Sequence, residues 1–217
     1  MKKIHLLYPT ARPDKFRETI QFWLDNAISP ENICVRVAVD SHKHCEQLSE
    51  YDVIVVNNPR CGITTPLLAL SHTINCDNHD DIIVVPSDDF FCPPAWDIYL
   101  LEKHSETNYE VLQVNDAHQH PLITMPVLTY NTLLKLGRVV YHPVYNHMFS
   151  DQEAYDVAKE LNILTVAEKS EPIFEHKNPM YGGKKDDVNR AVNAGYYDMK
   201  KIYQSRKGMN VYDKIKV

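Results

Sequence analysis

The chain begins as an alternation of short apolar runs with segments of helical periodicity. The runs are mostly rich in Val and Ile, which is typical of strands buried on both faces. The segments between them carry apolar residues three or four positions apart, the spacing of one helix face. This alternation predicts a mostly parallel sheet covered by helices on both sides. The expected strands are 4–8, 33–39, 51–56 and 81–85, and the expected helices start at Pro13 and cover 63–74.

The pattern becomes less regular beyond Asp89, where two prolines interrupt the chain. The strand expected over 122–127 contains Pro126, which lacks a backbone donor, so we expect it at a sheet edge. Gly182 and Gly183 are interpreted as a hinge before a last helix. The expected elements are helices over 95–103, 130–136, 150–161 and 186–205, and strands over 111–114, 122–127, 163–166 and 172–174.

Composition limits the class of protein. A chain of 217 residues with 44% hydrophobic residues is ordinary for a globular protein with one sizeable core. No apolar run reaches the roughly 20 residues of a membrane-spanning helix, so no membrane insertion is expected. Five widely spaced cysteines without a CxxC pair argue against a disulfide framework. We therefore expect a reducing, cytoplasmic location, in a bacterium or in a host cell.

Charge is distributed unevenly along the chain. The net charge is −6, yet the segment from Lys177 to the C-terminus holds ten Lys and Arg against four Asp and Glu. The remainder is strongly acidic. The sequence therefore predicts an acidic body over 1–180 and a basic helical tail over 181–217.

Two carboxylates directly follow the fourth predicted strand. Asp88 and Asp89 come after Val84, Val85, Pro86 and Ser87. In open α/β sheets, ligands bind outside the carboxyl ends of the strands. Paired carboxylates at such a place suit Mn²⁺ or Mg²⁺, which prefer oxygen ligands and bridge to phosphates. The alternative is an ordinary turn, in which Asp is common.

Three further strand ends are polar. The first strand leads into Pro9, Thr10 and Arg12, where a nucleotide can rest. The second ends at Asp40, which can accept a hydrogen bond from a base or ribose, and the third leads to the cation Arg60. Each taken alone also fits a solvated loop. Because the carboxyl ends of parallel strands share one edge, the four ends together predict a binding rim.

This succession resembles the nucleotide-sugar half of GT-A glycosyltransferases of the kind grouped as family 2. The similarity covers about residues 3–176, and its specificity comes from the order and spacing of short motifs. The matching segments are Pro9-Thr10-Ala11-Arg12 after the first strand, Asp40 after the second, Arg60 with Gly62 before a helix, and the metal motif Ser87-Asp88-Asp89.

The resemblance implies an α/β fold of GT-A type, with a mixed central sheet, flanking helices and a short C-terminal helical tail. Residues 1–92 would be the nucleotide-sugar half and 93–180 the acceptor half of a catalytic domain. It also implies Asp89 as a ligand of Mn²⁺ or Mg²⁺, His176 as a further ligand and Asp88 as a donor contact. Ser87 replaces an acidic residue of the family, which leaves open which Asp binds the metal.

The resemblance further implies that Asp151 is the catalytic base. It would take the proton of the acceptor hydroxyl, and a single displacement would invert the anomeric carbon. The local alternative is a helix start, because Ser150 and Glu153 have the spacing of a capping box and a helix dipole favours an anion nearby. We expect Ser150 and Glu153 to cap the helix and Asp151 to carry the chemistry.

The predicted activity is transfer of a sugar from a nucleotide-sugar donor to an acceptor hydroxyl, and UDP is the expected nucleotide of the donor. A nucleotidyltransferase is one alternative, but it would usually show a Gly-rich phosphate loop where this chain has Thr10-Ala11-Arg12-Pro13. A binding module without catalysis is another. The retained acidic residues and His176 argue against it.

The basic tail favours an anionic acceptor. Its cations are interleaved with Tyr196, Tyr197 and Tyr203, a combination that suits a phosphate-bearing partner. As a small chain of GT-A type, this protein resembles the enzymes that modify hydroxymethylated bases in viral DNA. Nucleic acid therefore ranks slightly ahead of a saccharide or a lipid-linked glycan. Four histidines of the acceptor half are candidates for contacts with the acceptor: His118, His120, His142 and His147. Most of them are interpreted as solvated loop residues.

Overall fold

Parallel strands form the first half of the central sheet. The computed structural model describes residues 2–57, 62–118, 120–177 and 187–217. Strand β1 (Ile4–Thr10) lies between β2 (Ile33–Val39) and β4 (Ile82–Val84), and β3 (Asp52–Val55) pairs with β2. These pairings are all parallel, as the apolar runs predict. Polar residues at the carboxyl ends therefore meet along one edge.

The second half makes the sheet mixed. Strand β7 (Pro126–Thr129) is antiparallel to β4 and to β6 (Val111–Gln113), and β8 (Leu164–Val166) runs parallel to β6. The order is β3-β2-β1-β4-β7-β6-β8. The expectation of an edge strand around Pro126 is wrong. Pro126 is the first residue of β7, where a missing donor is tolerated, and its carbonyl accepts the N–H of Val85.

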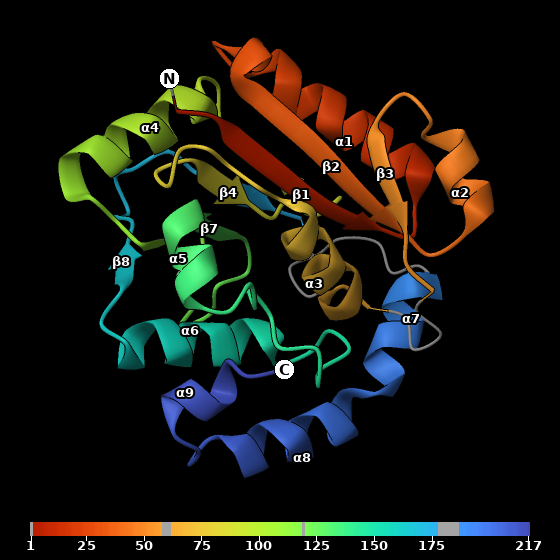
Figure 1. Cartoon of the computed structure of the whole chain (residues 1–217), viewed down its shortest axis with the longest axis vertical. Helices are drawn as coiled ribbons and strands as arrows, with labels where there is room; N and C mark the ends of the chain where they lie inside the picture. The colour runs from red at the N-terminus through yellow and green to blue at the C-terminus, as the bar shows by residue number, and fades with distance from the viewer. Residues whose placement is uncertain (1, 58–61, 119, 178–186) are drawn as a thin grey trace.

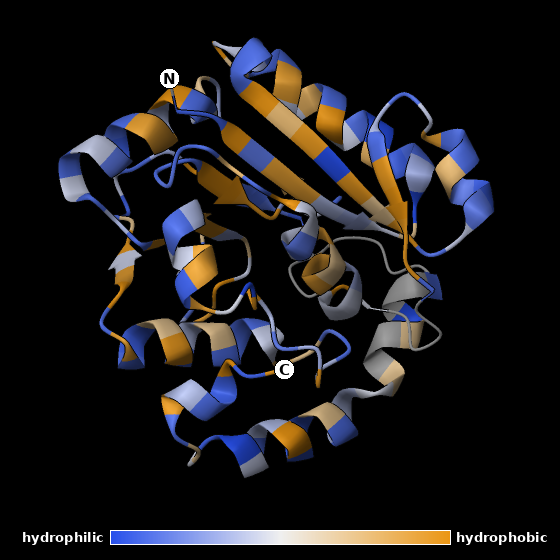
Figure 2. Ribbon diagram, in the orientation of Figure 1, coloured by the Kyte–Doolittle hydropathy of each residue, from blue (hydrophilic) through white to orange (hydrophobic). Residues whose placement is uncertain are grey.

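Helices cover both faces of this sheet (Figure 1). Side chains of α1 (Pro13–Asp25) and α4 (Trp96–Thr107) pack in one buried cluster with β1 and β4. The opposite cluster contains side chains of α3 (Thr64–Thr73), α5 (Tyr130–Lys135) and α6 (Ser150–Glu160). In Figure 2 the strands are largely apolar, whereas α1 and α6 alternate apolar and polar stripes. The sequence periodicities arise from this two-sided burial.

A second, two-stranded sheet lies beside the first. It pairs β5 (Phe90–Phe91) with β9 (Glu175–His176) in antiparallel fashion. The strand expected over 172–174 is displaced toward the C-terminus, and Ile173 forms only an isolated bridge to Asn115. Two short helical segments, η1 (Pro30–Asn32) and α2 (His42–Gln47), connect strands of the first half.

The basic tail consists of shorter helices than predicted. The single helix expected over 186–205 is divided at Gly195 into α7 (Asp187–Ala194) and α8 (Tyr196–Arg206), and α9 (Val211–Lys214) follows. Figure 1 shows α8 and α9 beside α6. The expected hinge at Gly182 and Gly183, and the domain boundary next to it, lie outside the described residues. None of the helices that the structure describes is long and apolar enough to cross a membrane.

Candidate functional site at the carboxyl edge of the sheet

The core of the candidate site joins the ends of β1 and β4. These strands are parallel neighbours, with Leu6 opposite Val84, so the segments that follow them emerge side by side. Arg12 Nε lies 2.7 Å from Asp88 Oδ2, and the Asp88 side chain is only 8% exposed. The loop itself is fixed by a hydrogen bond from the Arg12 N–H to Thr10 Oγ1 at 2.9 Å. The structure thus brings together Arg12, Thr10 and Asp88, and Pro9 lies in the same strand end.

Asp89 lies next to His176, as the sequence suggests. The pairing of β5 with β9 places Phe90 opposite His176, and their rings stack with centroids 4.1 Å apart. His176 Nε2 is 3.6 Å from Asp89 Oδ2, and Ser87 Oγ donates a hydrogen bond to Asp89 Oδ1. Burial opposes ionisation of Asp89, but His176 and Ser87 outweigh it and lower the pKa of this carboxyl. Asp89 is therefore an anion that faces an imidazole.

Asp151 enters the same region from α6. Its backbone carbonyl accepts the N–H of Ile123, and its Oδ1 accepts the N–H of Gln152 at 2.9 Å. Burial raises the pKa of the Asp151 carboxyl, while the backbone N–H bonds and His176 partly oppose the shift. A carboxylate that is reluctant to stay ionised has the character of a proton acceptor.

The expected capping box at this helix is wrong. Phe149 is the N-cap, with φ of 69° and no side-chain cap. Ser150 Oγ donates instead to the carbonyl of His147. Glu153 turns away to the tail, where its carboxylate lies 2.9 and 3.1 Å from the guanidinium of Arg206. Ser150 and Glu153 are structural, as expected, but through tertiary contacts rather than through capping.

His147 is electrostatically coupled to the site, unlike the solvated loop residues that most of the acceptor-half histidines are expected to be. Burial lowers the pKa of its imidazole, and Asp89, Arg12 and His176 all act on it electrostatically. Its Nδ1 is buried and has no hydrogen-bond partner among the described residues. The sequence offered one weak signal, namely that His147 stands four residues before Asp151 in the same loop–helix segment.

The loop that carries His147 is anchored to the start of α3. Thr64 Oγ1 donates a hydrogen bond to the carbonyl of Tyr145. Gly62 has φ of 139°, and a Cβ built there would lie 2.0 Å from the carbonyl oxygen of Asn146. Because only glycine permits this approach, the Gly62 position is needed to bring the loop against α3.

Two predicted donor contacts remain, Asp40 and Arg60, and the structure describes only the first of them. Asp40 follows β2, whose Val39 is opposite Thr10 of β1, so it lies along the same edge. Its side chain is 41% exposed and lies 2.7 Å from His44 Nδ1. Arg60 lies outside the described residues. Asp40 is thus a peripheral member of the edge, available to a ligand from the solvent side.

The tail is not a free basic face, as the sequence suggested, but is partly built into the body. Arg206 and Glu153 form an ion pair whose side chains are only 11% and 6% exposed. Tyr203 donates to Asp156 at 2.6 Å, and Lys214 pairs with Glu160 at 2.9 Å. These cations and tyrosines stabilise the packing of α8 and α9 on α6.

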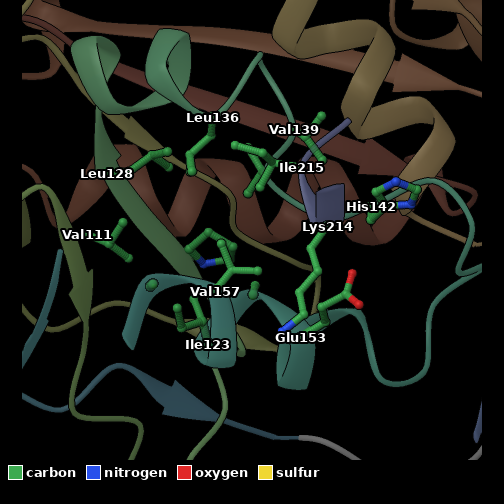
Figure 3. Close-up of a pocket in the computed structure, with 14 residues that line it drawn as sticks. Val111, Ile123, Leu128, Leu136, Val139, His142, Glu153, Val157, Lys214 and Ile215 are labelled. Carbon is green, nitrogen blue, oxygen red and sulfur yellow. The ribbon is translucent and has the colours of Figure 1, made fainter. Parts of the chain in front are cut away.

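A mainly apolar pocket lies under the tail and away from the carboxyl edge. It is bounded by β7, α6 and the α9 segment, with Lys214 and Ile215 on its tail side (Figure 3). Leu128 and Val157 are among the apolar residues that line it. This pocket shows that the tail closes part of the apolar core, and it contains none of the predicted site residues.

The sheet order and the carboxylate edge define an α/β fold of GT-A type, the fold of a class of glycosyltransferases, which confirms the predicted fold. No family model and no curated protein matches the chain. Among solved structures, S. aureus TarS 1–349 is similar, with a TM-score of 0.61, 11% identity, and coverage of 96% of this chain and 75% of that chain.

Further structures of the same protein also match. TarS 1–349 in complex with UDP gives a TM-score of 0.61 at 11% identity, again covering 96% of this chain and 75% of that chain. The complex with UDP-GlcNAc gives 0.59 at 14% identity, covering 88% of this chain and 66% of that chain. A longer TarS chain matches at 0.59 and 13% identity over 89% of this chain, which spans 39% of its length. At these identities the similarity establishes the fold.

Proposed function

We propose that the protein is a glycosyltransferase that uses a divalent cation to move a sugar from a UDP-linked donor to an acceptor hydroxyl, with inversion. The observation that carries this proposal is that candidate catalytic side chains from distant parts of the chain interact at one edge of the sheet. Asp89, Asp151 and His176 come from separate segments of the chain, yet they interact electrostatically at the edge that also holds the Arg12–Asp88 pair. No single turn or cap requires such an arrangement.

The donor would lie along the ends of β1, β2 and β4. Arg12 neutralises Asp88, which favours Asp88 as a donor contact and leaves Asp89 as the carboxylate for a cation. The same edge also carries Pro9, Thr10 and Asp40. Arg60 is proposed as a donor contact on the sequence alone. The solved complexes of TarS with UDP and with UDP-GlcNAc support a uridine donor.

Asp89 and His176 fit a cation site. A carboxylate oxygen and an imidazole nitrogen are suitable ligands for Mn²⁺. Their 3.6 Å separation is longer than a strong hydrogen bond and close to that of two ligands of one ion. A cation held here would neutralise charge on the departing diphosphate. Burial lowers the pKa of the nearby His147 imidazole, on which Asp89 and His176 act electrostatically.

Asp151 would act on the acceptor. As the acceptor oxygen forms its bond to the anomeric carbon, the carboxylate of Asp151 takes the hydroxyl proton, and the bond from that carbon to the diphosphate breaks. Attack from the face opposite the leaving group inverts the anomeric centre. The raised pKa of Asp151 suits this role, because a base is most effective when its pKa approaches the working pH.

The direct test is to incubate the protein with a panel of nucleotide sugars, with Mn²⁺ or with EDTA, and to identify the released product. Release of UDP that depends on the metal is the expected result. A nucleotidyltransferase would instead release pyrophosphate in a parallel incubation with a nucleoside triphosphate and a sugar 1-phosphate. Binding without release of either product, across donors and acceptors, would indicate a non-catalytic module.

For the acceptor, the proposal is a hydroxymethylated base in nucleic acid. The support is narrower than the sequence suggested, because Arg206 and Lys214 are occupied by the body. Lys200, Lys207 and Tyr197 remain exposed on the tail. Exposed cations beside an aromatic ring suit phosphate and base contacts. The modified base would have to be unpaired or flipped to reach Asp151.

Binding to single-stranded and duplex DNA as salt rises tests the acceptor. We expect affinity to fall steeply with salt, and Lys200→Glu with Lys207→Glu to weaken binding and reduce the salt slope. The double variant Lys15→Glu with Lys43→Glu, on the body, is the control with the same change of charge. Undetectable binding at low salt together with transfer to a neutral saccharide would replace this acceptor with a glycan.

A further inference from the structure

A second cluster of ligand-type side chains lies at the amino end of β1 and β4. His5 is on β1, Asp81 immediately precedes β4, and Cys76 lies in the segment between α3 and β4. Cys76 Sγ is 3.3 Å from His5 Nε2, which is 3.3 Å from Asp81 Oδ2. One potential ligand atom from each residue lies within 4.8 Å of the others. All three residues are buried.

This cluster is separate from the candidate glycosyltransferase site. His5 and Thr10 stand at opposite ends of β1, five residues apart, which corresponds to roughly 16 Å along a strand. The carboxyl edge with Asp89 lies beyond Thr10. None of the three residues has a role in the function proposed above, so a role for them requires its own explanation.

The positions of the three side chains are fixed by the backbone around them. Asp81 Oδ1 accepts the N–H of Lys3 at 2.9 Å, and the Asp81 carbonyl accepts the N–H of Tyr130. His5 lies within the parallel pairing of β1 with both of its neighbours. A ligand set on such rigid elements loses little conformational freedom when it binds an ion.

We propose that His5, Cys76 and Asp81 form a closed zinc site. Thiolate, imidazole and carboxylate are the ligands that zinc takes in proteins. In a tetrahedron with bonds of about 2.0–2.3 Å, neighbouring ligand atoms stand about 3.3–3.8 Å apart. The two 3.3 Å separations need little adjustment to meet this geometry.

A fourth ligand is available on the adjacent strand. Cys34 of β2 is the register partner of His5, and partners in register face the same side of a sheet. Its thiol is close enough to act electrostatically on Cys76. Water would occupy the fourth position of the tetrahedron, and Cys34 would replace it only after a change of side-chain rotamer and the loss of a second thiol proton.

The charges balance when zinc binds. Burial raises the pKa of Cys76 to about 12, and burial lowers the pKa of His5, so without metal the thiol is protonated and the imidazole is neutral. Binding transfers the Cys76 thiol proton to solvent, and with water in the fourth position the resulting thiolate and the Asp81 carboxylate neutralise the ion. A neutral cluster is the form that a buried site can hold.

His5 offers Nε2 to the cluster, since this is the nitrogen that faces Cys76 and Asp81. The second ring nitrogen, Nδ1, is buried and has no hydrogen-bond partner within the part of the chain that the structure describes, and it takes no part in the ligand set. The competing explanation is a plain hydrogen-bonded trio, which has the same distances but binds no metal.

Cobalt is the probe that separates the two explanations. The full chain, stripped with EDTA and carrying Asp89→Ala to remove the candidate site at the carboxyl edge, is titrated with Co²⁺. We expect one equivalent to bind with the strong near-ultraviolet absorption of a thiolate–cobalt bond, and Zn²⁺ to displace it. Saturation without that absorption, or no saturation, overturns the proposal.

Matched variants locate the thiolate. Cys76→Ser should abolish the absorption, whereas Cys92→Ser, which removes another buried cysteine outside the cluster, should retain it. Retention of the band in Cys76→Ser overturns the assignment. If Cys76→Ser does not fold, the melting temperature of the Asp89→Ala chain decides. Zinc at a hundred times its Kd should raise it by roughly 5–10 °C, and no rise contradicts a closed site.

Discussion

The two ends of strand β1 carry polar clusters of different kinds. At the amino end, His5 contacts Asp81 and Cys76, and all three are buried. At the carboxyl end, Asp89 and Arg12 remain partly exposed and face groups brought from later parts of the chain. A closed cluster can hold an ion but cannot admit a substrate, whereas an open one can do both. On the two proposals above, the same strand supports a structural role at one end and a chemical role at the other.

The largest effect is expected from removing the carboxylate of the open end. Asp89→Ala should abolish metal-dependent turnover, because it deletes the proposed cation ligand while the stacking of Phe90 on His176 remains. Turnover is measured with Mn²⁺, with Mg²⁺ and in excess EDTA. Asp25→Ala, an exposed carboxylate on α1, is the control. Full activity of Asp89→Ala, or of the unaltered protein in EDTA, would contradict the assignment.

Asp151→Asn should reduce transfer by roughly 10²–10⁴-fold, the usual contribution of a general base. The unaltered protein should lose activity as the pH falls through the raised pKa of Asp151, at a higher pH than an ordinary Asp would show. The variant should lack that acidic limb. Rate profiles against pH for both proteins provide the measurement.

Stability separates this role from a structural one. Because the folded pKa of Asp151 is raised, the protonated carboxyl favours the folded state, and that contribution is lost as the pH rises from the unfolded value through the folded one. At neutral pH the ionised group costs stability, so Asp151→Asn should melt at the same or a higher temperature. A lower melting temperature with unchanged activity of the folded fraction would make Asp151 structural.

His147→Gln tests whether the open end extends to the loop before α6. Asp89 and His176 act electrostatically on this imidazole, so its loss should raise the Mn²⁺ concentration needed for half-maximal activity by roughly 10–100-fold, the effect of removing a residue near the metal ligands. Activity is titrated against Mn²⁺. His142→Gln, in the same loop but bonded to the tail, is the comparison. An unchanged Mn²⁺ requirement would exclude this role.

Arg206→Ala should have the smallest effect on turnover and a large one on stability. It leaves Glu153 buried without its ion-pair partner, which costs about 3–5 kcal/mol. The neighbouring Lys207→Ala, at an exposed position, should change stability by less than about 0.5 kcal/mol. Urea unfolding gives both values. Equal stability of the two variants would mean that the tail is not held by this ion pair.

The sequence predicted the parallel half of the fold best, because its information is local. Runs of apolar residues predict β1 to β4. Because these strands are parallel, the prediction then places Asp88, Asp89 and Arg12 on one edge of the sheet. The coupling of His147 to the site was missed because nothing near it in sequence reveals that Asp89 acts on it electrostatically. The expected capping box failed for a similar reason, since Glu153 is paired with Arg206, which is 53 residues away.

The pairing of β5 with β9 also has a consequence for the order of folding. Phe90 pairs with His176, which lies far along the chain, so this two-stranded sheet closes a long loop. Contacts so distant in sequence form late, after locally encoded elements such as β1, α1 and β2. During synthesis the chain would display the Asp88–Asp89 edge while His176 is still unmade. The two-stranded sheet therefore makes completion of the edge a late event, which follows emergence of residue 176 from the ribosome.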